Sequence, residues 1–375
     1  MSEYACAGVD YGKIEPFKKA MIDVARQTAT FPNRRDVYIA TRLLGKHGGV
    51  YAYRGNKPHA WCATLEGLGN KSWIAELLRG NPLSGSNYQN IAYDTMMMAF
   101  NDCAAQGALP VIALDDVVAS DSGWFSDHAR SQDFARGILK ACRDAGAALV
   151  AGESPVYRYL VRPQPPVESA AVFTGSVVGI IAPDTRLITG ELLVPDSRII
   201  GIGSSGPHAN GISLMIRRVV GDETIKGLPY GFDTRLPSGA TIGGAIMTPT
   251  VCYVPLVERL LDEGVCVRAI VPGTGSGVAK LAYDTRPYRY CIHSWPDVPE
   301  IFLFFRERGV SCEDCLTTFN WGVGYYIFVG KEDVNAVLDC AYATGFSAKE
   351  IGVVEEGRRG TFFGPENIVL PPPGG

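Results

Sequence analysis

The stretch Gly203-Ser-Ser-Gly-Pro-His-Ala-Asn-Gly211 lies just past the middle of the 375-residue chain and combines small, flexible and hydrogen-bonding residues. It follows Arg198–Ile202, an apolar run that predicts a strand, and it precedes Ile212–Val220, whose pattern predicts a helix. Glycines and hydroxyl side chains between a strand and a helix can form a cradle for phosphate or an oxyanion. A tight connection without any ligand is the alternative that the same residues allow.

The loop overlaps a second pattern, because Gly201–Gly206 fits GxGxxG. After a predicted strand, that pattern is typical of dinucleotide-binding folds. Here the chain runs on through Pro207–Gly211 before the helix begins, and the match does not stand at the head of a series of βαβ units. We therefore expect a loop that can hold phosphate and not a Rossmann fold.

Outward from this loop, strands and helices are predicted in both directions. On the N-terminal side, the hydrophobic pattern predicts helices at 10–30, 90–106 and 133–145, two short strands within 51–64, and strands at 111–114, 147–151 and 170–181. On the C-terminal side, it predicts strands at 198–202, 267–271 and 322–329 and helices at 212–220, 250–262, 276–283, 298–308 and 332–344. Neither half follows a strict βαβ rhythm, so we expect an α+β fold. Turn-forming residues between Pro183 and Pro195 predict a boundary that divides the chain into domains 1–184 and 185–370.

Composition argues against several classes of protein. The chain has 46% hydrophobic and 20% charged residues, as soluble globular proteins do, and its length suits two domains. Its net charge is −4 and it has no long basic run, which argues against binding to a nucleic-acid backbone. No apolar run reaches the roughly 18–20 residues that span a bilayer, and the N-terminus lacks the features of a signal peptide. We therefore expect a cytoplasmic protein with neither a membrane nor a nucleic-acid partner.

The ten cysteines are a separate question. Without a secretion signal, they are expected to be reduced thiols rather than disulfides. Cys312 and Cys315 form one CxxC, with Cys291 and His293 nearby, but no second CxxC completes a typical four-ligand zinc site. Ordinary buried thiols are the expected state, and a zinc site is the alternative.

A short glycine loop in the N-terminal half indicates nucleotide chemistry. Leu65-Glu-Gly-Leu-Gly-Asn-Lys71 places a carboxylate and an amine around two glycines, and no GxxxxGK[ST] motif occurs, so a P-loop is excluded. Mg²⁺ prefers oxygen ligands, and a lysine can neutralise a transferring phosphoryl group. Asn101-Asp102 and Gly152-Glu153 add acidic groups beside apolar segments. Taken singly, each of these carboxylates is more often exposed at the end of an element than bound to a metal.

In their order and spacing, these segments resemble those of the aminoimidazole ribonucleotide synthetases, also called phosphoribosylformylglycinamidine cyclo-ligases. The most specific match is Gly203–Gly211, which differs from the family's GSSGPHSNG at a single residue. The loop at 65–71 is similar to the family's TDGVGTK, and residues 151–154 resemble its GGET. Further segments resemble AGVD, part of a glycine-rich hairpin, ND…QGAxP, APTR, LTGGG and TFNCGVG, in that order, at residues 5–10, 48–49, 101–110, 248–250, 273–277 and 318–324. The resemblance covers nearly the whole chain.

The resemblance implies two α+β domains and a homodimer whose N-terminal sheets combine into a barrel. It also implies that ATP and Mg²⁺ bind to the N-terminal domain and that formylglycinamidine ribonucleotide binds in the cleft between the domains. ATP would phosphorylate the formyl amide oxygen. The amidine nitrogen would then attack that carbon and close the imidazole ring.

Carried over by position, the resemblance also assigns individual residues. The metal ligands would be Glu66, Asp102 and Glu153. The catalytic residues would be Lys71, which would contact the nucleotide phosphates, and His208 and Asn210, which would face the substrate. The cofactor-binding residues would be Gly67, Gly69, Lys71, Asp102, Gly152, Gly206 and Gly275. Because His208 lies in a glycine-rich loop, we expect it to support little of the core.

The chain departs from the family pattern mainly on the nucleotide side. Glu66 stands where the family has Asp, and Leu65 and Asn70 each stand where it has Thr. Ser276 interrupts a triple glycine, and the segment after Glu153 is not the family's AEMPG. These changes leave three functions open: the cyclo-ligase reaction, another ATP-using activity of the superfamily (a small-molecule kinase or an amidotransferase-linked ligase), and a non-catalytic ligand-binding paralogue. For Glu66 we expect compensation by the neighbouring changes rather than loss of metal binding.

Overall fold

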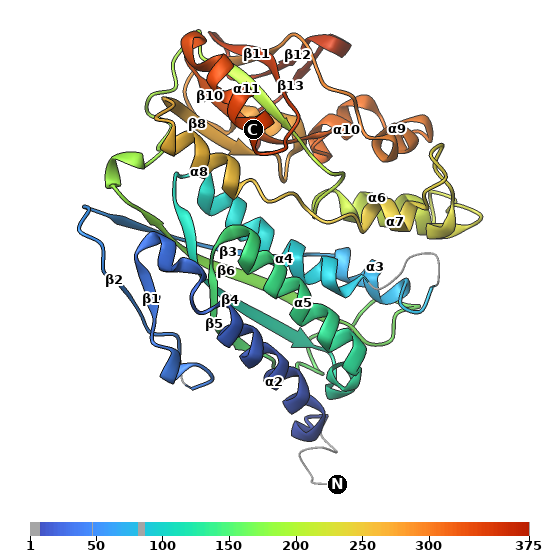
Figure 1. The fold of residues 1–375 in the computed structure, drawn as a ribbon. Helices are drawn as coiled ribbons and strands as arrows, with labels where there is room; N and C mark the ends of the chain where they lie inside the picture. Colours follow the sequence, from blue (N-terminus) through green and yellow to red (C-terminus); the bar gives the residue numbers. More distant parts are fainter. Residues whose placement is uncertain (1–7, 47, 82–86, 375) are drawn as a thin grey trace. The chain divides into compact units, whose positions relative to one another are not determined.

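The computed structural model describes residues 8–46, 48–81 and 87–374 (Figure 1). It contains two compact units. Unit 1 comprises residues 1–104 and 108–185, and unit 2 comprises residues 105–107 and 186–375. Of the motif at residues 5–10, residues 5–7 lie outside the described part. No helix within the described ranges is long and apolar enough to cross a membrane.

Unit 1 is built on a four-stranded sheet with the strand order β3-β6-β4-β5. The strands are β3 (Ala60–Gly67), β4 (Leu109–Ala119), β5 (Ala148–Glu153) and β6 (Ala171–Ile181). β3 and β4 both run antiparallel to β6, whereas β4 and β5 are parallel. This mixed sheet, together with the helices packed on it, confirms the predicted α+β class.

Helices cover one face of this sheet (Figure 1): α2 (Tyr11–Thr28), α3 (Lys71–Leu77), α4 (Tyr88–Ala104) and α5 (His128–Ala145). α4 packs on β3 and β6 and against α5, and α2 packs on β5 and α5. α5 begins before its predicted start at residue 133, because the Asp127 side chain accepts a hydrogen bond from Arg130 N and caps the helix. It ends where predicted, at Gly146, whose φ of +76° is the left-handed conformation that commonly follows a helix.

The other face of the sheet is only partly covered. A two-stranded ribbon, β1 (Val37–Ile39) and β2 (Tyr51–Tyr53), packs against apolar residues of β4, β5 and β6. Beyond it, Trp61, Leu65 and Val172 are 41%, 68% and 47% exposed. Each of the three alternates along its strand with residues that are more buried. A single chain therefore leaves an apolar sheet surface in contact with water.

Unit 2 is built on a seven-stranded sheet with the order β13-β12-β9-β11-β7-β10-β8. Its strands are β7 (Arg198–Gly203), β8 (Val267–Pro272), β9 (Tyr288–Ile292), β10 (Val323–Val329), β11 (Ala348–Glu356), β12 (Gly360–Phe363) and β13 (Ile368–Leu370). Its α-helices are α6 (Ile212–Val220), α7 (Ile242–Ile246), α8 (Val254–Asp262), α9 (Glu300–Glu307), α10 (Cys312–Thr318) and α11 (Val334–Ala343). β12 runs parallel to β9, and the other neighbouring strands are antiparallel.

Unit 2 confirms some sequence-based expectations and corrects others. β7 has antiparallel neighbours on both sides, so the rejection of a Rossmann fold is confirmed. Residues 277–283 form a 3₁₀ helix instead of the predicted α-helix, since Ser276 has a φ of +70° and Ala282 is non-helical. The strands β9, β11, β12 and β13 lie outside the predicted elements. β11 is central in the sheet, but charged residues at both ends leave an apolar run of only four residues, 351–354.

Candidate functional site

The loop Gly203–Gly211 connects β7 to α6 in unit 2 and is held in shape by Asn320. Asn320 Nδ2 donates a hydrogen bond to Gly206 O at 2.8 Å. Asn320 Oδ1 accepts hydrogen bonds from Ser204 Oγ at 3.1 Å and from Gly322 N at 3.0 Å. Because Asn320 is only 1% exposed, water does not compete for these bonds. A residue of the distant 318–324 motif therefore fixes the loop.

His208 lies inside this loop and is buried, with 5% of its surface exposed. Its Nε2 accepts a hydrogen bond from Ser205 N at 3.3 Å, and its backbone has a φ of +56°. It packs beside Tyr253 and Gly324, where an added Cβ on Gly324 would lie 2.7 Å from His208 Cε1 and 2.0 Å from the Tyr253 hydroxyl. The expectation that His208 supports little of the core is therefore wrong, because Tyr253 and Gly324, from two distant segments of the chain, pack against its ring.

Of the other predicted residues of unit 2, Asn210 and Gly275 are more open, whereas Gly206 is buried. Asn210 is half-buried, and its backbone N donates to Pro207 O at 3.2 Å. Gly206 has a φ of +143°, and Gly275 has open space where a side chain would stand. Backbone at Gly275 is thus accessible to a ligand.

In unit 1, the predicted nucleotide loop joins β3 to α3. Gly67 and Gly69 have open space around the position of an absent Cβ, and Gly69 has a φ of +70°, which favours glycine. Lys71, by contrast, is fully buried, and its Nζ lies 2.5 Å from Asp94 Oδ2, which is also fully buried. The structure therefore gives the Lys71 ammonium group a carboxylate partner on α4, and its contact with nucleotide phosphates stays a prediction.

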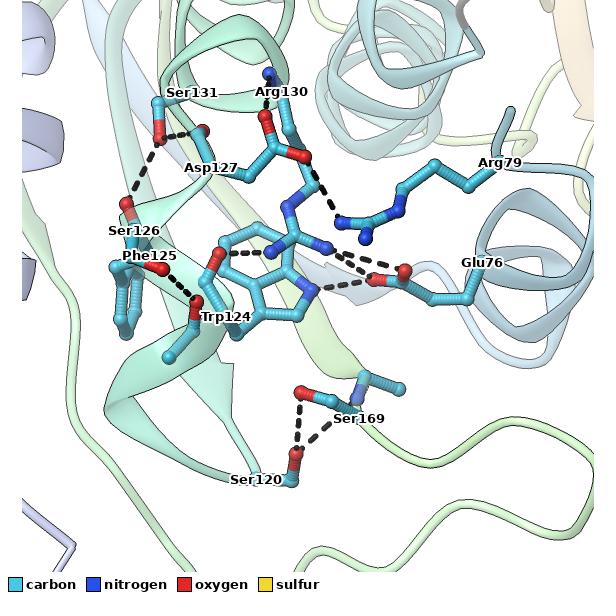
Figure 2. Close-up of polar contacts among 12 residues, drawn as sticks. Glu76, Arg79, Ser120, Trp124, Phe125, Ser126, Asp127, Arg130, Ser131 and Ser169 are labelled. Carbon is cyan, nitrogen blue, oxygen red and sulfur yellow. Dashed lines mark hydrogen bonds and ion pairs between the residues drawn. The ribbon is translucent and has the colours of Figure 1, made fainter.

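Figure 2 shows how α3 is held in place after this loop. Glu76, on α3, accepts hydrogen bonds from Trp124 Nε1 at 2.5 Å and from Arg130 Nη1 at 3.2 Å to each carboxylate oxygen. Arg130 is 5% exposed, donates from Nη2 to Trp124 O, and lies 4.2 Å over the Trp124 ring. Arg79 also pairs with Asp127, the cap of α5, at 2.9 Å. These contacts position the helix that directly follows the glycine loop.

The candidate metal ligands Glu66 and Glu153 lie far apart in the sheet. Glu66 is opposite Gly175, and Gly175 is in turn opposite Asp115. Asp115 is opposite Gly152, and Glu153 follows it. The two glutamates therefore occupy the two outer strands, separated by three strand spacings or about 14 Å. Among the described residues, no three His, Cys, Asp or Glu side chains form a group that could hold a metal ion.

The third candidate ligand, Asp102, is also distant from Glu66. Gly175, the cross-strand neighbour of Glu66, packs against Thr95 of α4. An added Cβ on Gly175 would lie 2.4 Å from Thr95 O. Asp102 is seven residues further along α4, which is about 10 Å along the helix axis. A single chain thus spreads the three residues over unit 1, and their individual roles as metal ligands stay predictions.

Two carboxylates outside the predicted motifs, Asp115 and Asp116, lie in β4 opposite Gly152 and Glu153, where β5 ends. Burial raises the pKa of Asp115 to about 7, and repulsion from Asp116 and Glu153 adds to the rise. Burial and the charge of Glu153 also raise the pKa of Asp116. The Oδ1 atom of each is buried and has no hydrogen-bond partner in the described structure. The sequence does contain a signal for these two residues, because an acidic pair directly follows the apolar run 111–114. A carboxylate directly after an apolar strand is also the pattern that indicated Glu153.

A cavity of about 580 Å³ adjoins this acidic end of the sheet. Its apolar wall comes from α2 and β5, and its charged residues include Lys18 and Lys46 as well as Glu153. Gly152 also lines it, and a Cβ there would lie 2.1 Å from Asp115 Oδ1, so a larger residue at this position would displace the Asp115 carboxylate. The volume suits a small-molecule ligand, and the two lysines beside carboxylates suit a phosphate group together with a cation.

The CxxC pair lies on α10 in unit 2. Burial raises the pKa of Cys315 to about 12 and also raises the pKa of Cys312. Cys315 is fully buried, whereas Cys312 is half-buried. Both thiols are therefore protonated near neutral pH, and among the described residues they belong to no group of three or more His, Cys, Asp or Glu that could hold a metal ion.

Comparison with known proteins relates this arrangement to one group of enzymes. Residues 45–181 match the family described as "AIR synthase related protein, N-terminal domain". The chain is 30% identical to the phosphoribosylformylglycinamidine cyclo-ligase of Thermococcus gammatolerans over 359 residues, which cover 94% of this chain and 97% of that protein. It is 29% identical to the protein of the same name from Pyrococcus horikoshii over 341 residues, which cover 90% and 91% of the two chains.

Solved structures with a similar fold carry other names. The hydrogenase maturation protein HypE matches with a TM-score of 0.61 at 15% identity, covering 92% of this chain and 97% of that chain. HypE in complex with ATP matches with a TM-score of 0.57 at 16% identity, over 86% and 87% of the two chains. Thiamine-monophosphate kinase from Stenotrophomonas maltophilia matches with a TM-score of 0.60 at 15% identity, over 91% and 94%. At such identities the likeness establishes a shared fold.

Proposed function

The chain belongs to the phosphoribosylformylglycinamidine cyclo-ligase family, and on that premise we propose that it converts formylglycinamidine ribonucleotide to aminoimidazole ribonucleotide, with ATP, in purine biosynthesis. In this reaction ATP phosphorylates the formyl amide oxygen, which turns a poor leaving group into phosphate. The amidine nitrogen then attacks the activated carbon, and phosphate leaves as the imidazole ring closes. A cytoplasmic location is part of this proposal.

The observation that carries the proposal is the conformation of the loop Gly203–Gly211. Its sequence is the most specific family match, and buried hydrogen bonds from Asn320 hold it in one shape. A loop that is fixed before the substrate arrives loses little conformational entropy on binding, and it keeps its donors aimed at charge that develops during reaction. This preorganisation supports a role in binding the ribonucleotide.

Within this loop we assign His208 a role in orienting or protonating the substrate. Because His208 Nε2 accepts a hydrogen bond from Ser205 N, the neutral ring carries its proton on Nδ1. Nδ1 is then the donor atom of the ring, and Nε2 stays bound to the loop. Asn210, which is half-buried two residues further on, offers an amide that can both donate and accept.

On the nucleotide side, we propose that the phosphates of ATP enter the cavity beside β5, near Lys18 and Lys46. Mg²⁺ fits the adjoining acidic end of the sheet, because the buried Oδ1 atoms of Asp115 and Asp116 have no partner and a cation would relieve the repulsion among these carboxylates. Asp116 and Glu153, which are opposite each other on β4 and β5, would hold the ion together with phosphate oxygens. When bound, Mg²⁺ supplies charge neutralisation at the transferring phosphoryl group.

We propose that the loop at 65–71 forms a second part of the nucleotide-binding site. Gly67 and Gly69 leave its backbone open to a phosphate group. A direct contact from Lys71 requires its ammonium group to exchange Asp94 for a phosphate oxygen, since the two are now 2.5 Å apart. Glu66 would then lie at the opposite edge of the sheet from Glu153 and act on a different part of the nucleotide or on a second ion.

We also propose that unit 1 forms a homodimer through its exposed sheet face. Trp61, Leu65 and Val172 place apolar surface in water, which a second sheet would cover. Closing two sheets into a barrel also removes unpaired strand edges, and β3 and β5 are the edge strands of this sheet. A two-fold symmetric pairing of identical faces is the simplest arrangement that achieves both.

The proposed reaction is tested by incubating purified protein with formylglycinamidine ribonucleotide and Mg·ATP and measuring ADP and the imidazole product. Equal amounts of the two products are expected. Formation of ADP without the imidazole product would indicate another ATP-using activity. Binding of the substrate without formation of ADP would indicate a non-catalytic paralogue. His208→Ala should abolish most turnover, whereas the matched change at the exposed His128, His128→Ala, should leave it unaltered.

A further inference from the structure

Cys62 and Cys103 are brought together by the packing of α4 on β3. Cys62 lies opposite Gly179 of β6, so the side chain of Cys62 and the missing side chain of Gly179 point to the same face of the sheet. This is the face that α4 covers, because Thr64, two residues from Cys62, donates its hydroxyl to Ala99 O of α4 at 3.0 Å. Cys103 follows Ala99 by one helical turn.

Gly179 provides the space in which the two thiols meet. An added Cβ on Gly179 would lie 2.3 Å from Cys103 Sγ, so this sulfur fills the volume that a side chain at 179 would take. Side chains directly opposite each other in an antiparallel pair have Cβ atoms about 5 Å apart, which places Cys103 Sγ beside Cys62. Cys103 Sγ donates a hydrogen bond to Ala108 O at 3.7 Å, and the two thiols are near enough to shift each other's pKa. Disulfides need Cβ atoms about 4 Å apart, so closing the S–S bond requires a small movement of the α4 backbone toward β3 together with rotation of the two side chains.

The two thiols differ in accessibility. Cys62 is half-buried, whereas Cys103 is fully buried. The neighbouring Cys103 thiol lowers the pKa of Cys62, whereas Cys62 and burial raise the pKa of Cys103, so Cys62 is the thiol of this pair that ionises first. By contrast, burial raises the pKa of Cys142, Cys291 and Cys315. Of Cys62 and Cys103, Cys62 is therefore the thiol that an oxidant from solvent reaches first, and Cys103 lies beside it.

We propose that Cys62 and Cys103 form a redox-modification site in which hydrogen peroxide converts the two thiols into a disulfide between β3 and α4. The Cys62 thiolate attacks the peroxide and becomes a sulfenic acid, and the Cys103 sulfur then displaces water from it to form the S–S bond. In total, two thiols lose two protons and two electrons, and one peroxide becomes two molecules of water. A small thiol such as dithiothreitol reverses the reaction by exchange.

The disulfide would connect two segments that the proposed function places at the nucleotide. β3 leads into the loop at 65–71, and Asp102 immediately precedes Cys103 on α4. A covalent link at this point restricts the sliding of α4 along β3. A positional error of about 1 Å in an active site can reduce a reaction rate by roughly a hundredfold, so the link should slow turnover. This consequence rests on the proposed function.

The test treats the intact reduced protein with hydrogen peroxide, blocks remaining thiols by alkylation, and maps peptides under non-reducing conditions. A crosslinked peptide pair that contains Cys62 and Cys103, absent from Cys62→Ser and Cys103→Ser and reversed by dithiothreitol, is expected. Cys266→Ser is the matched control, because Cys266 is exposed and should leave the crosslink intact. Complete alkylation of Cys62 and Cys103 as single thiols after peroxide, or oxidation of Cys62 to a sulfinic acid without a crosslink, would overturn the proposal.

Turnover of Mg·ATP, measured on the same samples, separates this inference from the proposed function. Oxidised wild type should lose about tenfold or more of its rate and recover with dithiothreitol, whereas Cys62→Ser should keep its rate after peroxide. If the crosslink forms but the reduced protein does not cyclise the substrate, the redox site is supported and the proposed function is rejected. A crosslink in an active protein with unchanged turnover would reject the regulatory consequence.

Discussion

Replacing Asp115 by asparagine should make unit 1 more stable at pH 8 and remove most of its loss of stability between pH 5 and pH 8. Asp115 is 6% exposed, and burial and repulsion from Asp116 and Glu153 raise its pKa to about 7. In the unfolded chain an aspartate ionises near pH 4. The folded state therefore binds this proton more tightly than the unfolded state.

The sign and the size of the effect follow from this difference. Between pH 4 and pH 7 the folded chain holds one proton more than the unfolded chain, so the free energy of unfolding falls as pH rises. Below pH 4 both states are protonated and the full stability is present. Each pH unit costs about 1.4 kcal/mol, so the total loss is on the order of 4 kcal/mol, of which about 3 kcal/mol falls above pH 5. The amide side chain in Asp115→Asn cannot ionise, so the variant should lack this contribution.

Hydrogen exchange of the β4 and β5 amides measures the effect within unit 1 itself. Protection factors, corrected for the intrinsic exchange rate at each pH, are compared at pH 5 and pH 8 in EDTA, so that no divalent cation pairs with the carboxylates. Asp184→Asn, a change at an exposed aspartate, is the control. Equal changes in protection between the two pH values for wild type and Asp115→Asn would refute the assigned ionisation.

Four further predictions concern the two loops and the exposed sheet face. His208→Ala should lower turnover and the unfolding midpoint together, since the ring is both buried and in the loop; calorimetry and steady-state kinetics measure the two. Lys71→Met should destabilise unit 1 by about 3–5 kcal/mol in urea unfolding, because it removes the ammonium partner of the buried Asp94 carboxylate, and it should weaken ATP binding. Leu65→Lys should convert a sedimenting dimer into monomers, and a wild type that sediments as a monomer at micromolar concentration would contradict the dimer. Glu66→Ala should weaken the Mg²⁺ dependence of ATP turnover sharply and Glu66→Asp should be intermediate, while identical magnesium titrations would mean that Glu66 does not bind the ion.

Elements with their own local signals could be predicted from the sequence. α6 has its predicted bounds, and α2 follows the apolar spacing within residues 10–30. β11 could not be predicted, because its apolar run is short and its position between β9 and β7 depends on strands far away in the chain. The start of α5 was set by a cap at Asp127, which lies outside the apolar pattern used to place the helix.

The same distinction between local and tertiary signals applies to the residues of the candidate site. Linear motifs located Glu66, Asp102 and Glu153, but the strand order that separates the two glutamates is a tertiary property. The burial of His208 depends on Tyr253 and Gly324, which no local pattern connects to the loop. Likewise, the contact between Cys62 and Cys103 exists only because Gly179, more than seventy positions further along, leaves room for a sulfur atom.

The strand order of unit 1 has a consequence for genetics as well as for chemistry. If each active site takes the β3 edge from one chain and the β5 edge from its partner, Glu66→Ala and Glu153→Ala chains should complement each other when mixed. Each mixed dimer would hold one site with both glutamates and one site with neither, so that an equimolar mixture would regain about a quarter of the wild-type sites. If both edges serve the same chain, every site in the mixture would lack one glutamate and complementation would fail. Mixing two variants that are inactive alone would therefore show whether the β3 edge and the β5 edge of one active site come from the same chain or from different chains.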